Sequence, residues 1–301
     1  MSLIVTGSIG IDTVITPTSR ADEVLGGSCV YFAAAASFFG PVRIVGAVGD
    51  DFPEEHLATF ERFGIDTAGL ERRAGAKTFR WTGRYHDNMN ERDTVEVALN
   101  VLAETLPAVP ETYRDSRYIF LANTHPAGQM QLLANFPDAR LVVADTMDLW
   151  INTALAELKQ LMQRLDGLVL NDSEAQMLTG ESNLVTASKR IIEMGPKFVV
   201  IKKGEHGCLL NHADGLSVLP AYPAANVVDP TGAGDSFAGG MMGYLADAGQ
   251  SDLPAIKRAL AFGTIVASFN IEAFSLEKLA QIDRTDIDAR LEQFAASIRF
   301  D

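Results

Sequence analysis

The chain has 301 residues, of which 47% are hydrophobic and 21% charged, and this balance excludes wholesale disorder. Its 39 acidic and 25 basic residues give a formal net charge of −14, which disfavours binding to nucleic acid or to an anionic membrane surface. No apolar run reaches the roughly 18 residues that span a bilayer, and no basic signal-peptide region begins the chain. The two cysteines, Cys29 and Cys208, lie far apart, which favours a reducing compartment. We therefore expect a cytoplasmic protein.

Short β-branched runs alternate with helical patterns from end to end, which predicts an α/β protein with a mainly parallel sheet flanked by helices. The expected buried strands are Leu3–Thr6, Val42–Val45, Tyr118–Leu121, Leu141–Ala144, Leu168–Leu170 and Phe198–Ile201. The expected helices are Tyr31–Phe39, Ala154–Leu165, Glu174–Leu178, Leu184–Met194 and Ser236–Ala248. Because no repeat or linker interrupts the pattern, we expect one domain over residues 1–301.

The segment from Thr78 to Val101 departs from this alternation and predicts a two-stranded ribbon joined by a loop at residues 86–90. Its large apolar residues alternate with smaller or polar ones, and a period of two would place them on one face: Phe79, Trp81, Tyr85, Val95, Val97, Leu99 and Val101. A two-stranded ribbon is only marginally stable alone, so this face must cover the main domain, a substrate or a second subunit. An edge hairpin and a lid both fit the pattern.

The strongest chemical signal is the run from Asp229 to Phe237, which reads DPTGAGDSF. Gly232 and Gly234 let the backbone approach a ligand closely, and we expect a helix to begin at about Asp235. The free amides and the dipole of that first turn favour a bound phosphate. An aspartate in an anion site is explained if it removes a proton from an attacking hydroxyl, although a plain helix cap is an equally good interpretation.

Other polar groups follow predicted strands at their carboxyl ends, where open α/β sheets bind ligands. Asn171 and Glu174 stand one helical turn apart and could order a hydrated magnesium ion or simply cap a helix. Lys202, Gly204 and Gly207 suit a loop along a nucleotide, and a hairpin turn explains them nearly as well. No dinucleotide fingerprint or Walker A sequence occurs in the chain, so a nucleotide-binding oxidoreductase is improbable.

Together these pieces resemble the ribokinase-like (PfkB) carbohydrate kinases. The run from Asp229 to Phe237 is similar to the second signature of that family, and further elements occur in the family's order: Gly7–Asp12, Gly26-Gly27, Val45–Phe52, Asn171–Glu174, Leu178–Gly180 and Gly204–Gly207. The resemblance covers nearly the whole chain. It implies a ribokinase-like three-layer sandwich with a small β lid, formed by residues 76–102 with part of residues 12–26.

The resemblance also implies roles for these residues. Asp235 would be the catalytic base, while Gly232, Ala233 and Gly234 would form the anion hole. Asp12, with Gly26 and Gly27, would bind the hydroxyls of the substrate. The nucleotide would be ATP, bound along residues that include Asn171, Glu174, Lys202, Gly204 and Gly207.

The family further implies ions and a partner. Glu174 would hold Mg²⁺ through water, and Asp229 and Thr231, with the loop from Phe269 to Phe274, would bind a monovalent cation such as K⁺. Its lid often forms dimers, and an apolar ribbon face is too large to leave in water, so we expect a homodimer through the ribbon.

The acceptor is the open question. Kinases of ribose or fructose in this family commonly carry an Asn where Tyr31 stands, and residues 145–150 also differ from the usual sugar-kinase sequence. The combination of Tyr31, residues 79–81 and residues 145–147 looks closer to a subgroup that includes nucleoside kinases. An aromatic pocket could stack a base or pack a sugar face, and both aromatic groups could equally be core residues. The leading hypothesis is an ATP-dependent kinase of a primary alcohol on a sugar or sugar-containing molecule, with a nucleoside kinase as the alternative. A non-catalytic metabolite sensor is a third hypothesis, which an intact Asp235 disfavours.

Overall fold

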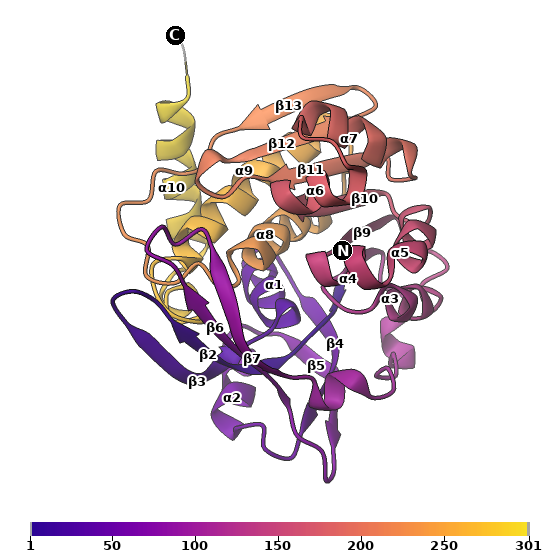
Figure 1. The fold of residues 1–301 in the computed structure, drawn as a ribbon, viewed down its shortest axis with the longest axis vertical. Helices are drawn as coiled ribbons and strands as arrows, with labels where there is room; N and C mark the ends of the chain where they lie inside the picture. Colours follow the sequence, from indigo (N-terminus) through magenta and orange to yellow (C-terminus); the bar gives the residue numbers. More distant parts are fainter. Residues whose placement is uncertain (1, 300–301) are drawn as a thin grey trace.

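A nine-stranded sheet forms the centre of the structure, a computed structural model that describes residues 2–299 (Figure 1). Its strands follow the order β13 (Gly215–Leu219), β12 (Cys208–His212), β11 (Phe198–Lys202), β10 (Gly167–Asn171), β9 (Leu141–Asp145), β8 (Tyr118–Leu121), β1 (Leu3–Thr6), β4 (Val42–Gly49) and β5 (Asp66–Arg73). Neighbours from β11 to β5 are parallel, whereas β12 and β13 add an antiparallel edge. The predicted mainly parallel sheet is therefore confirmed.

Helices cover both faces of this sheet. On one face the core contains residues of α1 (Ser28–Ser37), α2 (Glu54–Arg62), α8 (Ala233–Ala248), α9 (Leu253–Asn270) and α10 (Arg284–Ser297). On the other face it contains residues of α3 (Pro126–Leu133), α4 (Asp148–Thr153), α5 (Leu155–Met162), α6 (Asp172–Thr179) and α7 (Leu184–Glu193). The result is a three-layer arrangement. Among the described residues, no helix combines the length and the apolar character needed to cross a membrane.

The double cover explains why the central strands could be found in the sequence. All residues of β1 and β8 are buried, so these strands read as continuous apolar runs, and their predicted bounds match residue for residue. The remaining predicted strands are longer by one or more residues; β4, for example, continues from Val45 to Gly49. Helix starts were less accurate, since α1 begins at Ser28 and not at Tyr31.

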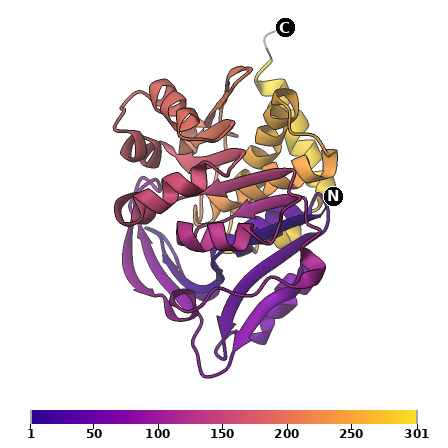
Figure 2. The same cartoon turned by 90° about the vertical axis from the view of Figure 1, so that its right-hand side faces the viewer.

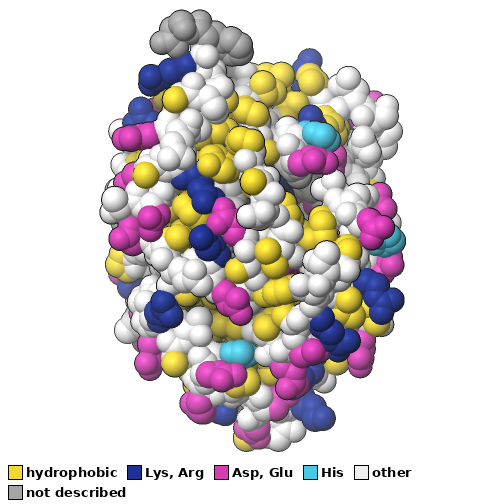
Figure 3. All heavy atoms as spheres, turned by 90° about the vertical axis from the view of Figure 1, so that its left-hand side faces the viewer, with side chains coloured by type: hydrophobic (Ala, Val, Ile, Leu, Met, Phe, Trp, Pro, Cys, Tyr) yellow, Lys and Arg dark blue, Asp and Glu magenta, His cyan; other side chains and the backbone are white. Residues whose placement is uncertain are grey.

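A second, four-stranded sheet stands beside the main one, and we call it the small sheet (Figure 2). Its order is β3 (Arg20–Gly26), β2 (Gly10–Ile15), β6 (Phe79–Tyr85) and β7 (Arg92–Ala98), with β2 and β6 parallel and the outer pairs antiparallel. The predicted ribbon is therefore half of a larger sheet. On the side of the molecule where β3 and α10 lie, hydrophobic side chains reach the surface between charged ones (Figure 3).

The expectation that all large apolar residues of the ribbon share one face is wrong. The register of β6 with β7 shifts between Thr82 and Gly83, so that Val95 is an extra residue between Thr94 and Glu96. Val97 still pairs with Trp81. The strand then ends at Ala98, because a short 3-10 helix begins at Asn100, and Val101 is buried in it and is not part of the ribbon.

Candidate active site

Residues 229–234, which we call the glycine loop, lead into α8. This helix begins at Ala233 and not at Asp235. Gly232 is the N-cap residue, with φ of 73°, and no side chain makes a capping hydrogen bond. Asp235 therefore stands inside the first turn, and its interpretation as a helix cap is wrong. The Ala233 amide donates to the Pro230 carbonyl at 3.1 Å, whereas within residues 2–299 the amides of Gly232 and Gly234 have no acceptor, which is an arrangement that suits an anion.

Both glycines of this loop are in close contact with other side chains. A Cβ on Gly232 would lie 2.2 Å from Tyr31 Cγ, and one on Gly234 would lie 2.6 Å from Lys202 Nζ. Lys202 is the last residue of β11, so its ammonium group approaches the glycine loop from the carboxyl end of that strand. The glycines thus let a positive charge and a helix N-terminus meet at one point.

Three carboxyl groups interact electrostatically around Lys202. Burial raises the pKa of Asp235 to about 6, while the charges of Lys202 and Arg92 act to lower it. Burial also holds the pKa of Asp145, at the end of β9, well above its usual range, with repulsion from Asp235 as the next cause. The same effect raises the pKa of Glu174, again opposed by Lys202. Because carboxyl groups outnumber Lys202 here, an anionic ligand needs either an accompanying cation or hydrogen bonds from Lys202 and the backbone amides.

Asn171 and Glu174 form a capping box at the start of α6. Asn171 Oδ1 accepts a hydrogen bond from the Glu174 amide at 2.7 Å, and Glu174 Oε2 accepts one from the Asn171 amide at 2.8 Å. The plain structural interpretation of this pair is therefore correct. The cap also fixes the Glu174 carboxylate beside Lys202, since Asn171 and Lys202 are partners in the β10–β11 register.

Asp12, Gly26 and Gly27 come together at the small sheet. A Cβ on Gly26 would lie 1.9 Å from Asp12 Oδ2, and the Gly27 amide donates a hydrogen bond to the Asp12 carboxylate. Burial, followed by repulsion from Asp229 and Asp235, raises the pKa of Asp12 to about 7. Asp12 Oδ1 and Tyr31 Oη are buried without a hydrogen-bond partner in the described part of the chain.

Asp229 is completely buried behind the glycine loop. Its Oδ1 accepts a hydrogen bond from the Thr231 amide at 2.8 Å, and within residues 2–299 its Oδ2 has no partner. Asn270 Nδ2 donates to the Thr231 carbonyl at 2.8 Å, and the amides of residues 228 and 229 donate to the Ile271 carbonyl. The loop after α9 thus lies directly against Asp229.

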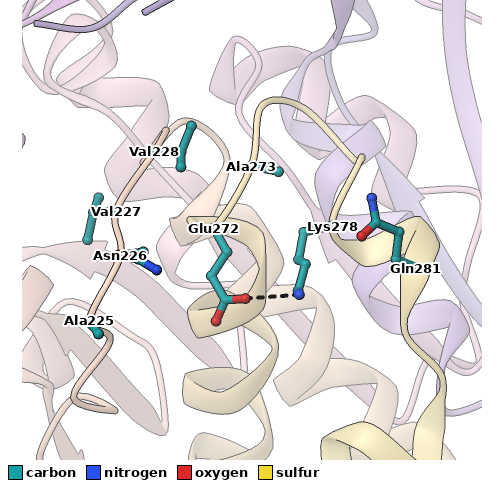
Figure 4. A pocket seen from close by; sticks show the side chains of 8 residues that line it. All are labelled: Ala225, Asn226, Val227, Val228, Glu272, Ala273, Lys278 and Gln281. Carbon is teal, nitrogen blue, oxygen red and sulfur yellow. Dashed lines mark ion pairs between the residues drawn. The ribbon is translucent and has the colours of Figure 1, made fainter. Parts of the chain in front are cut away.

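An open pocket of about 590 Å³ lies between the segments that meet there (Figure 4). One wall is the segment from Ala225 to Val228, and the other includes Glu272, which is paired with Lys278 at 3.2 Å. Arg290 holds the other carboxylate oxygen of Glu272 at 2.8 Å. These ion pairs fix the loop that contacts Asp229.

The Gly204–Gly207 segment is a tight turn between β11 and β12, in which Gly207 has φ of 82°. The hairpin interpretation is therefore correct for its backbone. The turn also meets the small sheet, since Asn90 Nδ2 donates to Glu205 Oε1 at 2.9 Å.

Sequence reasoning missed several residues of this centre. Asp145 was noted only as part of a departure from the family, although it is the last residue of its strand, as Asn171 is. Tyr85 receives a hydrogen bond from Thr231 Oγ1 at 3.1 Å, and Asn270 supports the same residue. Tyr31, considered as a stacking surface, is only 1% exposed and packs beneath Gly232 as a core residue.

A family model described as pfkB family carbohydrate kinase matches residues 18–278. The chain belongs to this family. A cytidine kinase from Thermococcus kodakarensis is 31% identical over 251 residues, which cover 81% of this chain and 88% of that protein. This pfkB-family chain is accordingly a phosphotransferase with an alcohol acceptor, an ATP-dependent kinase of a sugar or a nucleoside.

Solved structures of this pfkB fold superpose closely. A Burkholderia thailandensis nucleoside kinase in complex with inosine is 20% identical, with a TM-score of 0.79 over 98% of this chain and 99% of that one. A putative ribokinase II from Escherichia coli, in complex with ATP and Mg²⁺, is 17% identical, with a TM-score of 0.78 over 97% and 99%. The ribokinase-like fold expected from the sequence is therefore confirmed.

Proposed function

We propose that this chain transfers the γ-phosphoryl group of ATP to a primary hydroxyl of a neutral, sugar-containing molecule, and that a nucleoside is the acceptor to test first. The observation that carries the proposal is the position of Asp235, which is buried in the first turn of α8 and makes no capping hydrogen bond. The neighbouring amides of Gly232 and Gly234 have no acceptor within residues 2–299. The similarity to a cytidine kinase supports a nucleoside in preference to a free sugar.

In this proposal Asp235 removes the proton of the attacking hydroxyl. The acceptor oxygen then bonds to the γ-phosphorus, the bond from that phosphorus to the β,γ-bridging oxygen breaks, and ADP leaves. The amides at Gly232 and Gly234, together with the helix dipole that begins at Ala233, stabilise the charge on the transferring group. A pKa of about 6 suits Asp235 to this role, because the group is ionised at neutral pH and still accepts a proton readily.

Asp12 is proposed to bind the acceptor hydroxyls, with Gly26 and Gly27 shaping its position. The partnerless Asp12 Oδ1 and Tyr31 Oη are groups that acceptor hydroxyls can satisfy. The charged neighbours that act on Asp12 are carboxylates, Asp229 and Asp235, which repel an acidic acceptor. This surrounding favours a neutral nucleoside or sugar over a sugar acid or a sugar phosphate.

The nucleotide is proposed to lie along Asn171, Glu174, Lys202, Gly204 and Gly207. A magnesium ion fits beside this group, because Glu174 and Asp145 supply carboxylates at the ends of β10 and β9. When bound, Mg²⁺ would offset the charge of the phosphates there. Residues Glu174 and Asp145 would hold it through water, and Lys202 would orient the phosphates.

A monovalent cation, K⁺ in the first instance, is proposed beside Asp229. The fit rests on Asp229 Oδ2, a completely buried carboxylate oxygen without a partner in the described residues. Oxygens of Asp229, of Thr231 and of the loop from Phe269 to Phe274 would hold the ion. The ion would compensate the Asp229 charge and stiffen the neighbouring glycine loop.

The small sheet is proposed to act as a lid and to join two copies of the chain. Its residues Val95, Val97 and Leu99 are each about half exposed, at 52%, 52% and 48%, which is unusual for large apolar side chains on one strand and its end. Closure over the acceptor would exclude water and limit wasteful ATP hydrolysis. The two cysteines are free and buried, which fits the cytoplasm as the proposed compartment.

The test is ATP consumption with a panel of cytidine, inosine, ribose and an acidic sugar, measured as ADP release. Turnover with a nucleoside and none with the acid is expected. Binding of cytidine or inosine without turnover would instead support the metabolite sensor. Turnover with the acidic sugar would contradict the assignment of Asp12 and its neighbours to a neutral acceptor.

A further inference from the structure

Arg92 occupies a distinctive position in the small sheet. It pairs with Tyr85 in the β6–β7 register, and antiparallel partners point to the same face. Tyr85 is buried on that face and accepts a hydrogen bond from Thr231 at the glycine loop. Arg92 therefore points from the small sheet toward the glycine loop.

Two further contacts fix this orientation. The Arg92 guanidinium carbon lies 5.8 Å from the centroid of the Trp81 ring, and Trp81 is the register partner of Asp12. Close by, the Asn90 side chain is hydrogen-bonded to Glu205 in the turn after β11. The end of the small sheet is thus attached to the proposed nucleotide loop, with Arg92 two residues away.

Arg92 carries a charge that no carboxylate pairs with in residues 2–299. Arg80, on the opposite face of β6, is bound by Glu23 at 2.8 Å and by Asp51 at 3.3 Å, whereas Arg92 forms no ion pair with any residue in the range 2–299. Yet its charge reaches Asp235 and Glu174, since it acts to lower the pKa of each. An unpaired arginine near several carboxylates and an anion site is suited to bind a ligand phosphate.

We infer that Arg92 is a catalytic residue that binds the terminal phosphate of the nucleotide from the side of the small sheet, opposite Lys202 and the glycine loop. This inference rests on the proposed function, because it needs a phosphate at the start of α8. Arg92 would donate N–H groups to the γ-phosphoryl oxygens and offset charge as the group moves to the acceptor. It would also link closure of the small sheet to the presence of ATP in preference to ADP.

The test compares wild type with Arg92→Gln and Arg92→Lys, using Arg84→Gln as the matched control. Arg84 is an exposed arginine of the same sheet, and it alternates with Tyr85 so that it points to the other face. Binding of a non-hydrolysable ATP analogue and of ADP is measured by calorimetry with Mg²⁺ present. Melting temperatures check that each variant is folded.

For Arg92→Gln we expect the ATP analogue to bind about 10-fold to 100-fold more weakly, as for loss of a charged hydrogen bond, while ADP affinity changes less than about twofold. Arg92→Lys should recover part of the loss, and Arg84→Gln should match wild type. With an active acceptor, kcat should fall about 100-fold or more in Arg92→Gln at little-changed acceptor KM.

Equal loss of analogue and ADP affinity in Arg92→Gln, or none of either, would overturn the inference. Its failure can be told apart from failure of the proposed function. If wild type phosphorylates a nucleoside and Arg92→Gln behaves as Arg84→Gln, the role of Arg92 is contradicted but the proposed function stands. If wild type neither binds the ATP analogue nor consumes ATP with any acceptor, both the proposed function and the role of Arg92 are contradicted.

Discussion

The carboxylate of Asp12 occupies the space that a side chain on Gly26 would need, with Oδ2 only 1.9 Å from the position of a Gly26 Cβ. The two residues belong to neighbouring antiparallel strands, since Gly26 ends β3 and Asp12 in β2 is the register partner of Val24. Gly26 is thus explained by the closeness of a functional group, and its backbone has an ordinary negative φ.

A first prediction follows for Gly26→Ala. The added methyl group must displace Asp12 from its hydrogen bond with the Gly27 amide, because a Cβ at this distance overlaps the carboxylate. We expect acceptor KM to rise at least about tenfold, as for loss of a hydrogen bond to a charged group, with ATP KM unchanged. Steady-state kinetics in both substrates checks this, and an unchanged acceptor KM would contradict the position given to Asp12.

For Asp235→Asn we expect kcat to fall by at least about 10²-fold, the lower range for a general base. Because Asp235 makes no capping hydrogen bond, its replacement should leave the melting temperature and nucleotide binding near wild type. Asp252→Asn is a suitable control, since Asp252 caps α9 through the Ala255 amide and lies outside the site. Near-normal turnover in Asp235→Asn would remove its role as the base.

The activity should depend on pH through Asp12. Its pKa of about 7 means that the carboxylate is largely protonated below that pH, so kcat/KM for the acceptor should fall as pH decreases through about 7. Asp229→Asn removes a repelling negative charge, which stabilises ionised Asp12 and lowers its pKa. The acidic limb of the profile should therefore move to lower pH.

This profile is measured in buffers without K⁺, so that no bound cation compensates the Asp229 charge, with Asp247→Asn, a substitution at an exposed position near the end of α8, as control. An acidic limb at the same pH in Asp229→Asn and in wild type would show that Asp229 does not act on the titrating group.

Glu174→Gln separates the two roles of the capping box. Glutamine can still accept the hydrogen bond of the Asn171 amide, so helix α6 should keep its N-terminus. The lost charge should raise the Mg²⁺ concentration for half-maximal activity about 10-fold to 100-fold, as for other groups that orient a metal indirectly. Acceptor KM should stay constant.

The control for Glu174→Gln is Asn183→Ala, which removes the N-cap of α7 at the Thr186 amide. Its loss should destabilise the protein by about 1 kcal/mol without any change in the Mg²⁺ requirement. If Glu174→Gln instead changed only the stability, the carboxylate would be a cap and nothing more.

Val97→Glu tests the proposed dimer. Val97 is 52% exposed in the single chain, and a charge there would oppose its burial against a second copy. Sedimentation should show a dimer for wild type at micromolar concentration and a shift toward monomer for Val97→Glu. Leu216→Glu is a matched control, because Leu216 is 48% exposed but lies on β13 at the far edge of the main sheet. A wild-type monomer would contradict the dimer.

The sequence was most informative where burial is complete. β1 and β8 are buried on both faces, so their residues form the short, continuous apolar runs that are typical of central parallel strands. β3 could not be found in this way, because four of its seven residues are charged or alanine and only its last two residues are buried. β3 forms because it pairs with β2, and this pairing cannot be seen in the residues of β3 alone.

The same distinction applies to the site. The glycine loop and Asp235 carry a local pattern, and they could be singled out without a structure. Arg92 could not, because the extra residue at Val95 changes which side chains of β7 face the glycine loop. The contact of Tyr85 with Thr231 could not be found either, because it joins two segments that lie far apart in the sequence. Asp145 could have been found from its place directly after the predicted strand Leu141–Ala144, and it is the last residue of β9 in the structure.

The parallel pairing of β2 with β6 has a consequence for how the molecule acquires activity. Gly10 meets Phe79, and Asp12 meets Trp81, only after β3, α1, β4, α2 and β5 have intervened along the chain. Contacts between such distant segments form slowly during folding, because closing the long loop between them costs conformational entropy before the contacts can stabilise the chain. During refolding, recovery of catalysis should therefore lag behind recovery of helical circular dichroism, and catalytic competence is among the last properties the chain gains.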